Sequence, residues 1–128
     1  ALWKAVYEMM VVDTIENVPI DADDLPDYAE RLFLRYRAHP EILRLNFWHA
    51  LERVKQDGVP QMVVDARSRK LAAIRKAQQA GRVTRAMSAE LLLSIILSIS
   101  MMDNPSAGVS VAAKREAIGE AVRRLIAP

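Results

Sequence analysis

The residue types that could hold a metal ion or form a covalent intermediate are sparse in this sequence. The chain contains no cysteine, which excludes thiolate nucleophiles, thiolate metal sites and disulfides. Neither of its two histidines, His39 and His49, follows a glutamate by three residues, the spacing of carboxylate metal sites in helical bundles. The four glycines are too scattered for a phosphate-binding loop, and no Gly-x-Ser-x-Gly turn is present. We therefore predict no metal site, no cofactor and no catalytic residue.

The basic side chains allow one alternative that involves catalysis. Thirteen of the eighteen basic residues lie within residues 31–85. Four of them could line a helical pocket that grips a small dicarboxylate, as in small all-helical mutases: Arg35, Arg44, Arg67 and Lys70. Most of these positions fall on predicted solvent faces, where charged side chains are ordinarily just solvated. An arginine-lined small-anion enzyme stays an alternative, as does a helical interaction module without a ligand. Direct DNA binding by this chain is disfavoured, because its basic residues are not concentrated on one face.

Two polar side chains, Arg67 and Gln78, fall within the apolar face of one predicted helix. A charge in that position is costly unless it is paired or reaches water. Arg67 could extend to solvent or pair with an acid such as Asp13 or Glu16; alternatively, both side chains could line a cavity and contact a ligand. His49 has two similar interpretations, a satisfied and partly buried histidine or a ligand contact. The sequence leaves these alternatives open.

The composition favours helices as the elements that position these residues. Of the 128 residues, 52% are hydrophobic, 27% are charged and only four are glycine. Apolar residues recur at helical spacing in six segments: 1–18, from the acidic connector 21–24 to about 38, 41–55, 60–80, 89–103, and a last one that Ser110 opens. We predict an all-α fold, a six-helix antiparallel bundle in one domain spanning residues 1–128. The longest apolar run, residues 91–102, is too short to cross a bilayer, which needs about 20 residues, so no membrane contact is predicted.

Residues at the predicted helix ends have the chemistry of helix caps. Asp24 precedes a helix whose first turn accepts Pro26, and Ser88 and Ser110 stand before the last two helices. Gly81 is a stop signal for the fourth helix. The connections are short, which predicts helices that pack against their neighbours in sequence.

Apolar spacing also predicts which face of each helix is buried. On the second helix the predicted buried residues are Leu25, Tyr28, Ala29, Leu32, Phe33 and Tyr36. On the third they are Leu43, Phe47, Ala50, Leu51 and Val54. On the fourth they are Val63, Val64, Leu71 and Ile74.

The two ends of the chain differ in a way that predicts different roles. All seven aromatic residues precede Ala50, whereas the fifth helix is apolar almost all round and carries Ser94 and Ser98 one turn apart. A helix of that kind must be covered on both sides. We predict that residues 88–128 pair with the same helices of a second chain in an intermolecular four-helix bundle, closed by a two-fold axis. The predicted interface residues are Leu92, Ser94, Ile96, Ser98, Ile118, Val122 and Leu125.

The order of these features resembles the C-terminal domain of TetR-type transcriptional regulators over essentially the whole chain. Ala-Leu-Trp-Lys-Ala-Val at residues 1–6 is similar to the start of the long helix that follows the family's helix-turn-helix domain. Arg-Ala-His-Pro-Glu at residues 37–41 is similar to the family's break between the next two helices. The segments Ala-Gly-Arg-Val at 80–83 and Ser-Ala-Glu at 88–90 resemble its link into the dimerisation helices.

This resemblance implies a cytoplasmic repressor that acts as a homodimer and binds a small effector. Its operator DNA would be read by an N-terminal domain that this chain lacks, so no DNA-contacting residue is assigned. The family's effector pocket lies among the helices that match residues 1–80, in agreement with the aromatic half. From helical faces, and not from a family motif, we predict an apolar or aromatic ligand and the following contacts: Met10, Phe33, Tyr36, Phe47, His49, Arg67, Leu71 and Gln78.

Overall fold

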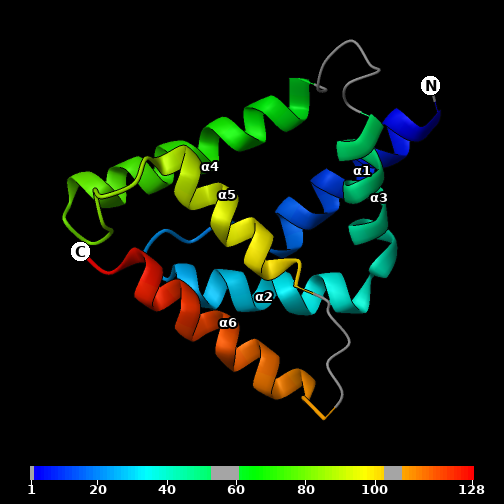
Figure 1. Ribbon diagram of the computed structural model, residues 1–128. Helices are drawn as coiled ribbons and strands as arrows, with labels where there is room; N and C mark the ends of the chain where they lie inside the picture. The colour runs from blue at the N-terminus through cyan, green and yellow to red at the C-terminus, as the bar shows by residue number, and fades with distance from the viewer. Residues whose placement is uncertain (1, 53–60, 103–107) are drawn as a thin grey trace.

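All six predicted helices are present in the computed structural model, which describes residues 2–52, 61–102 and 108–128 (Figure 1). They are α1 (Leu2–Asn17), α2 (Leu25–Ala38), α3 (Pro40–Glu52), α4 (Gln61–Gln79), α5 (Ala89–Ser100) and α6 (Val111–Ile126). Those ranges contain no strand, so the predicted all-α fold is confirmed. The predicted helix ends at Lys55, Pro60 and Asp103 lie outside the described residues. No described helix is both long and apolar enough to span a bilayer.

The predicted helix caps are present, and each is a hydrogen bond between residues close together in the sequence. Asp24 accepts a hydrogen bond from the backbone N–H of Asp27 at 3.2 Å, and Pro26 occupies the first turn of α2. Ser88 and Ser110 each accept one from the N–H three residues further on, at 3.3 and 3.1 Å. These bonds satisfy backbone donors that the first turn of a helix leaves free. They set where α2, α5 and α6 begin.

Helix α2 is the central element, and it contacts α3, α5 and α6. Its predicted buried face is confirmed, because all six predicted side chains are buried. In Figure 1, α6 (orange to red) runs beside α2 (cyan). Gly119 permits this close approach, since a Cβ atom there would lie 2.8 Å from Cδ of Glu30 on α2. Glu30 accepts a hydrogen bond from Arg115 of α6 at 3.4 Å across the same junction.

Helix α5 contacts α2, α4 and α6 with one face and leaves the other uncovered. Leu92, Leu93 and Ile96 are completely or almost completely buried, whereas Leu91 is 57% exposed, and Ser94 and Ser98 are exposed as well. The helix therefore has an inner and an outer face within this chain, although its sequence is apolar on both.

Four of the seven predicted interface residues are used inside the chain. The side chains of Leu92, Ile96, Ile118 and Val122 are at most 1% exposed, because α5 and α6 turn these positions toward α2. They are not available to contact a second chain. Ser94 and Ser98 remain exposed, and Leu125 is partly exposed.

The predicted buried face of α3 is correct for Leu43, which is buried, and wrong for the other described residues. Phe47 is 52% exposed and Leu51 76% exposed, and Ala50 is also exposed, whereas Ile42 and His49 are buried. Val54 lies outside the described residues. Helix α3 is apolar on two sides, so its neighbours α1 and α2 decide which side is covered. The side that α1 covers is the one with His49, whose ring stacks on Tyr7 of α1 with ring centres 4.3 Å apart.

Candidate functional site

A cleft of about 870 Å³, open to solvent on one side, is lined by described side chains of α1 to α5. This volume falls within the range of small-molecule sites, about 300–1,000 Å³. Its lining residues are Tyr7, Val11, Tyr36, Asn46, His49, Ala50, Val63, Val64, Ala66, Arg67, Ser68, Lys70, Leu71, Leu93, Ser94, Leu97 and Met101. The cleft therefore joins the four helices predicted to hold the pocket with α5, which the sequence assigned only to dimerisation.

One end of the cleft is aromatic and polar, and the opposite wall is aliphatic. Tyr7 of α1 and His49 of α3 stack nearly parallel, with 5° between the ring planes. Across the cleft, α5 contributes Leu93 and Leu97, and its C-cap residue Met101 follows them. Such a mixture of apolar surface with a few polar groups is typical of sites that bind and orient small ligands.

Helix α4 adds two cationic side chains, Arg67 and Lys70, three residues apart and so on one side of the helix. Burial lowers the pKa of the Lys70 ammonium below its usual value, and the nearby Arg67 guanidinium lowers it further. Arg67 itself is exposed, and it forms no ion pair within the described ranges. The predicted partner Asp13 instead pairs with Arg35.

A smaller chamber of about 70 Å³ adjoins the cleft and shares Lys70, Tyr36 and Asn46 with it. Thr14 and Met10 of α1 also line this chamber. The hydroxyl oxygen of Thr14 is buried and has no hydrogen-bond partner among the described residues. An unsatisfied buried polar atom is uncommon in native proteins, and the Thr14 hydroxyl is a donor that the described residues leave unused.

The predicted ligand contacts divide into two groups. Those that line the cleft are Tyr36, His49, Arg67 and Leu71, and Met10 lines the adjoining chamber. Those that line neither are Phe33, Phe47 and Gln78. The sequence did not predict Asn46, Leu93, Leu97 or Met101 as ligand contacts, and it suggested Lys70 only for the enzyme alternative. The all-round apolarity of α5 was the one signal that this helix has a second partner.

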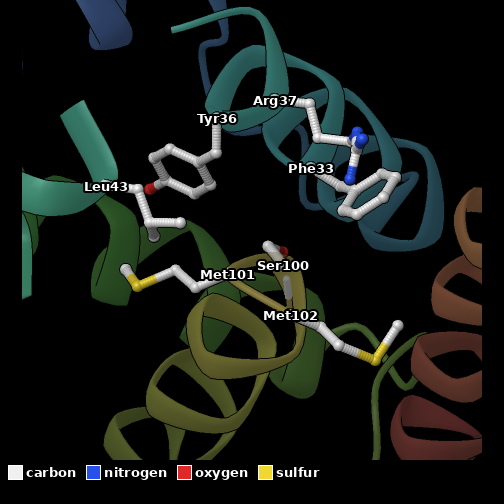
Figure 2. Close-up of a pocket in the computed structure, with 7 residues that line it drawn as sticks. All are labelled: Phe33, Tyr36, Arg37, Leu43, Ser100, Met101 and Met102. Atoms are coloured by element: carbon white, nitrogen blue, oxygen red, sulfur yellow. The ribbon is translucent and has the colours of Figure 1, made fainter. Parts of the chain in front are cut away.

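Phe33 belongs to a separate and tightly packed part of the core, shown in Figure 2. The space that it lines with Tyr36, Leu43 and Met101 measures about 10 Å³, which is at most enough for one water molecule. The Arg37 guanidinium lies over the Phe33 ring, 5.9 Å from its centre. Phe33 thus has a packing role, and Tyr36, which lines both this space and the cleft, separates the two.

Gln78 stabilises the loop between α4 and α5. Its side-chain amide donates hydrogen bonds to the carbonyl oxygens of Thr84 and Met87, at 3.0 and 2.9 Å. These bonds satisfy loop carbonyls and explain a polar residue on this apolar face. No ligand is needed to account for Gln78.

The four basic residues of the enzyme alternative do not gather in one place. Only Arg67 and Lys70 line the cleft, while Arg35 pairs with Asp13 and lies 3.1 Å from the His39 ring nitrogen. Within the described ranges no cluster of three or more His, Cys, Asp or Glu residues could hold a metal ion.

Tyr36, one of two buried tyrosines that line the cleft, predicts a loss of stability at alkaline pH. Burial, and to a lesser extent Tyr7, raises the pKa of Tyr36 from about 10 to about 12. Between these values the unfolded chain has released the phenol proton that the folded chain keeps, so stability falls as the pH rises. The contribution of Tyr36 is complete below about pH 10, and by pH 12 we expect a loss of up to about 3 kcal/mol. Urea denaturation between pH 10 and pH 12 measures this loss in the free energy of unfolding, and Tyr36→Phe should lose less than the parent chain. An equal loss in both proteins would contradict the role of Tyr36.

The comparisons with known proteins agree with this architecture. The family model described as "Tetracyclin repressor-like, C-terminal domain" matches residues 24–126. The chain belongs to the TetR family of C-terminal domains. The resemblance predicted from the sequence is therefore confirmed.

Two relatives of this TetR domain come from Streptomyces coelicolor. The HTH-type transcriptional repressor SCO4008 is 34% identical over 104 residues, which cover 77% of this chain and 52% of that repressor. The chain thus spans about half the length of that relative. The crystal structure of SCO4942, described as a transcriptional regulator, superposes with a TM-score of 0.81 at 29% identity and covers 98% of this chain and 73% of that one. TetR-family regulators act as dimers that bind DNA and small-molecule effectors.

Proposed function

We propose that this chain is the effector-binding and dimerisation domain of a TetR-type repressor, which a small apolar or aromatic ligand releases from operator DNA. The observation that carries this proposal is the cleft of about 870 Å³ between α1 and α5. Its volume suits a drug-sized molecule, and its walls combine aliphatic and aromatic side chains with polar ones. The parent protein would act in the cytoplasm, where its operator lies.

The position of α1 supports a mechanism for release. Helix α1 contacts α3 and α4, and Tyr7 and Val11 on it line the cleft. A ligand that occupies the cleft would favour one placement of α1 over another, provided that it binds the two placements with different affinity. In a TetR-type regulator this helix follows the DNA-reading domain, so its displacement would change the spacing of two such domains in a dimer.

The uncovered face of α5 supports the dimer. Leu91, Ser94 and Ser98 follow one another at helical spacing on α5, and all three are exposed within the chain. The Ser98 hydroxyl donates to the Ser94 carbonyl oxygen at 2.8 Å, so covering it leaves no unsatisfied donor. We therefore place the homodimer contact on this outer face, with Leu125 and the exposed alanines of α6 beside it.

A test of the cleft uses the neutral aromatic probe N-phenyl-1-naphthylamine, whose fluorescence rises in apolar surroundings. We expect the chain to bind it, and Val63→Trp, which fills part of the cleft, to weaken binding by about 10-fold or more. Ala72→Trp is the matched control, because Ala72 is an exposed residue on the same helix that does not line the cleft. The proposal fails if the probe does not bind, or if the two tryptophan variants bind it equally.

A further inference from the structure

The charges that the described residues bring to the cleft are of one sign. Its described lining includes the cations Arg67 and Lys70 and no aspartate or glutamate. Two carboxylates on neighbouring parts of the chain, one on α4 and one on α1, have other partners. Asp65 accepts a hydrogen bond from Gln61 at 2.9 Å, and Asp13 pairs with Arg35. The cleft therefore presents positive charge that no described carboxylate neutralises.

Lys70 is the more informative of the two cations. It lines the main cleft, the chamber with Thr14, and a third hollow of about 170 Å³ beside Arg69. Its ammonium group loses hydration through burial and faces the like charge of Arg67, and both effects lower its pKa. A partly buried cation without a carboxylate partner destabilises the empty protein, and an anion that enters the cleft removes that cost.

The chamber beside Lys70 also has groups that can donate hydrogen bonds. The Thr14 hydroxyl is buried without a partner, and the Asn46 side chain lines both the chamber and the cleft. An anionic oxygen can accept hydrogen bonds from an ammonium and an amide together, and its charge also offsets that of the ammonium. The polar end and the aliphatic wall of α5 thus suit the two ends of one amphipathic molecule.

We infer that the effector is an amphipathic anion, with its carboxylate or similar oxyanion held by Lys70 and Arg67 and its apolar body against Leu93, Leu97 and Met101. This inference rests on the proposed function of the same cleft. Charge selects the ligand because a neutral molecule of equal shape leaves Lys70 unpaired. A bare inorganic anion gains nothing from the aliphatic wall and binds more weakly.

Two fluorescent probes that share one skeleton test the inference. The first is 8-anilino-1-naphthalenesulfonate, and the second, N-phenyl-1-naphthylamine, is the same molecule without its sulfonate. We expect the anionic probe to bind the full chain more tightly than the neutral one. Lys70→Gln should lower the affinity for the anionic probe by about 10-fold or more, because it removes a charge-assisted hydrogen bond. It should change the affinity for the neutral probe by less than about 2-fold.

The controls separate local from general electrostatic effects. Lys76→Gln removes the same charge from an exposed position on α4 outside the cleft, and it should leave both affinities nearly unchanged. Arg67→Gln alters an exposed residue, so this variant remains folded and provides a second measurement if Lys70→Gln does not fold; it should weaken the anionic probe selectively.

The outcomes distinguish the inference from the function on which it rests. Equal binding of the two probes, or an equal effect of Lys70→Gln and Lys76→Gln, overturns the anion assignment and leaves the ligand cleft intact. Selective loss of the anionic probe in Lys70→Gln and Arg67→Gln supports it. If neither probe binds, the cleft is not a ligand site, and both proposals are overturned.

Discussion

Replacement of Phe33 by alanine is expected to lower the free energy of unfolding by about 3–5 kcal/mol. The Phe33 side chain is 1% exposed, and the space beside it, about 10 Å³, leaves no room for neighbours to rearrange without cost. The substitution removes buried aromatic surface, leaves a cavity between α2 and the end of α5, and removes the contact with Arg37. Domains are commonly stable by about 5–15 kcal/mol, so the loss is a large part of the total.

Urea denaturation followed by circular dichroism measures this loss. Leu34→Ala is the matched control, because Leu34 is the next residue on α2 but is 37% exposed, and its truncation should cost less than about 1 kcal/mol. Since Phe33 does not line the cleft, the folded fraction of Phe33→Ala should bind the neutral probe with nearly unchanged affinity. A loss below about 1 kcal/mol would show that this part of the core is not tightly packed.

A charge on the outer face of α5 is expected to convert the dimer to a monomer. Ser98→Arg places a guanidinium on a residue that is exposed in the single chain and that the proposed interface covers. A two-fold axis brings two such charges into one contact, and an unpaired buried charge costs about 3–5 kcal/mol. The dissociation constant of the dimer should therefore rise by at least about 100-fold.

Sedimentation velocity or native mass spectrometry of the parent chain and of Ser98→Arg, each at several concentrations, measures the dissociation constant of the dimer. Gln79→Arg adds the same charge at an exposed position at the end of α4 and should leave the dimer intact. Because Ser98 is exposed in the single chain, the monomeric variant should still fold. A monomeric parent chain, or a dimer unaffected by Ser98→Arg, would contradict the placement of the interface on α5.

The helices and their ends could be predicted because local chemistry determines them. Asp24, Ser88 and Ser110 satisfy N–H groups only three residues away, and Gly81 adopts the positive φ of 78° that other residues avoid. The buried face of α2 could also be predicted, because its polar and apolar residues fall on opposite sides. None of these features depends on a distant part of the chain.

The buried faces of α3 and α5 could not be predicted in the same way, because each helix is apolar on more than one side. Phe47 and His49 lie on different sides of α3, and its contacts with α1 and α2, the stacking of Tyr7 on His49 among them, decide which side is inside. Similarly, α2 covers Leu92 and Ile96 and leaves Leu91 exposed. Spacing along one helix contains no information about the neighbour that covers it.

For the cleft, too, local features could be predicted from the sequence, whereas contacts between helices could not. The sequence by itself determined an all-helical domain, its six elements, its TetR resemblance and an aromatic first half, since caps, turns and periodicity are local properties. Only the tertiary structure decided that α5 forms a wall of the cleft, that Gln78 braces a loop, and that Lys70 faces Arg67 without a carboxylate in the described lining. The physical reason is that burial and charge pairing depend on contacts between helices, which only the folded chain brings together.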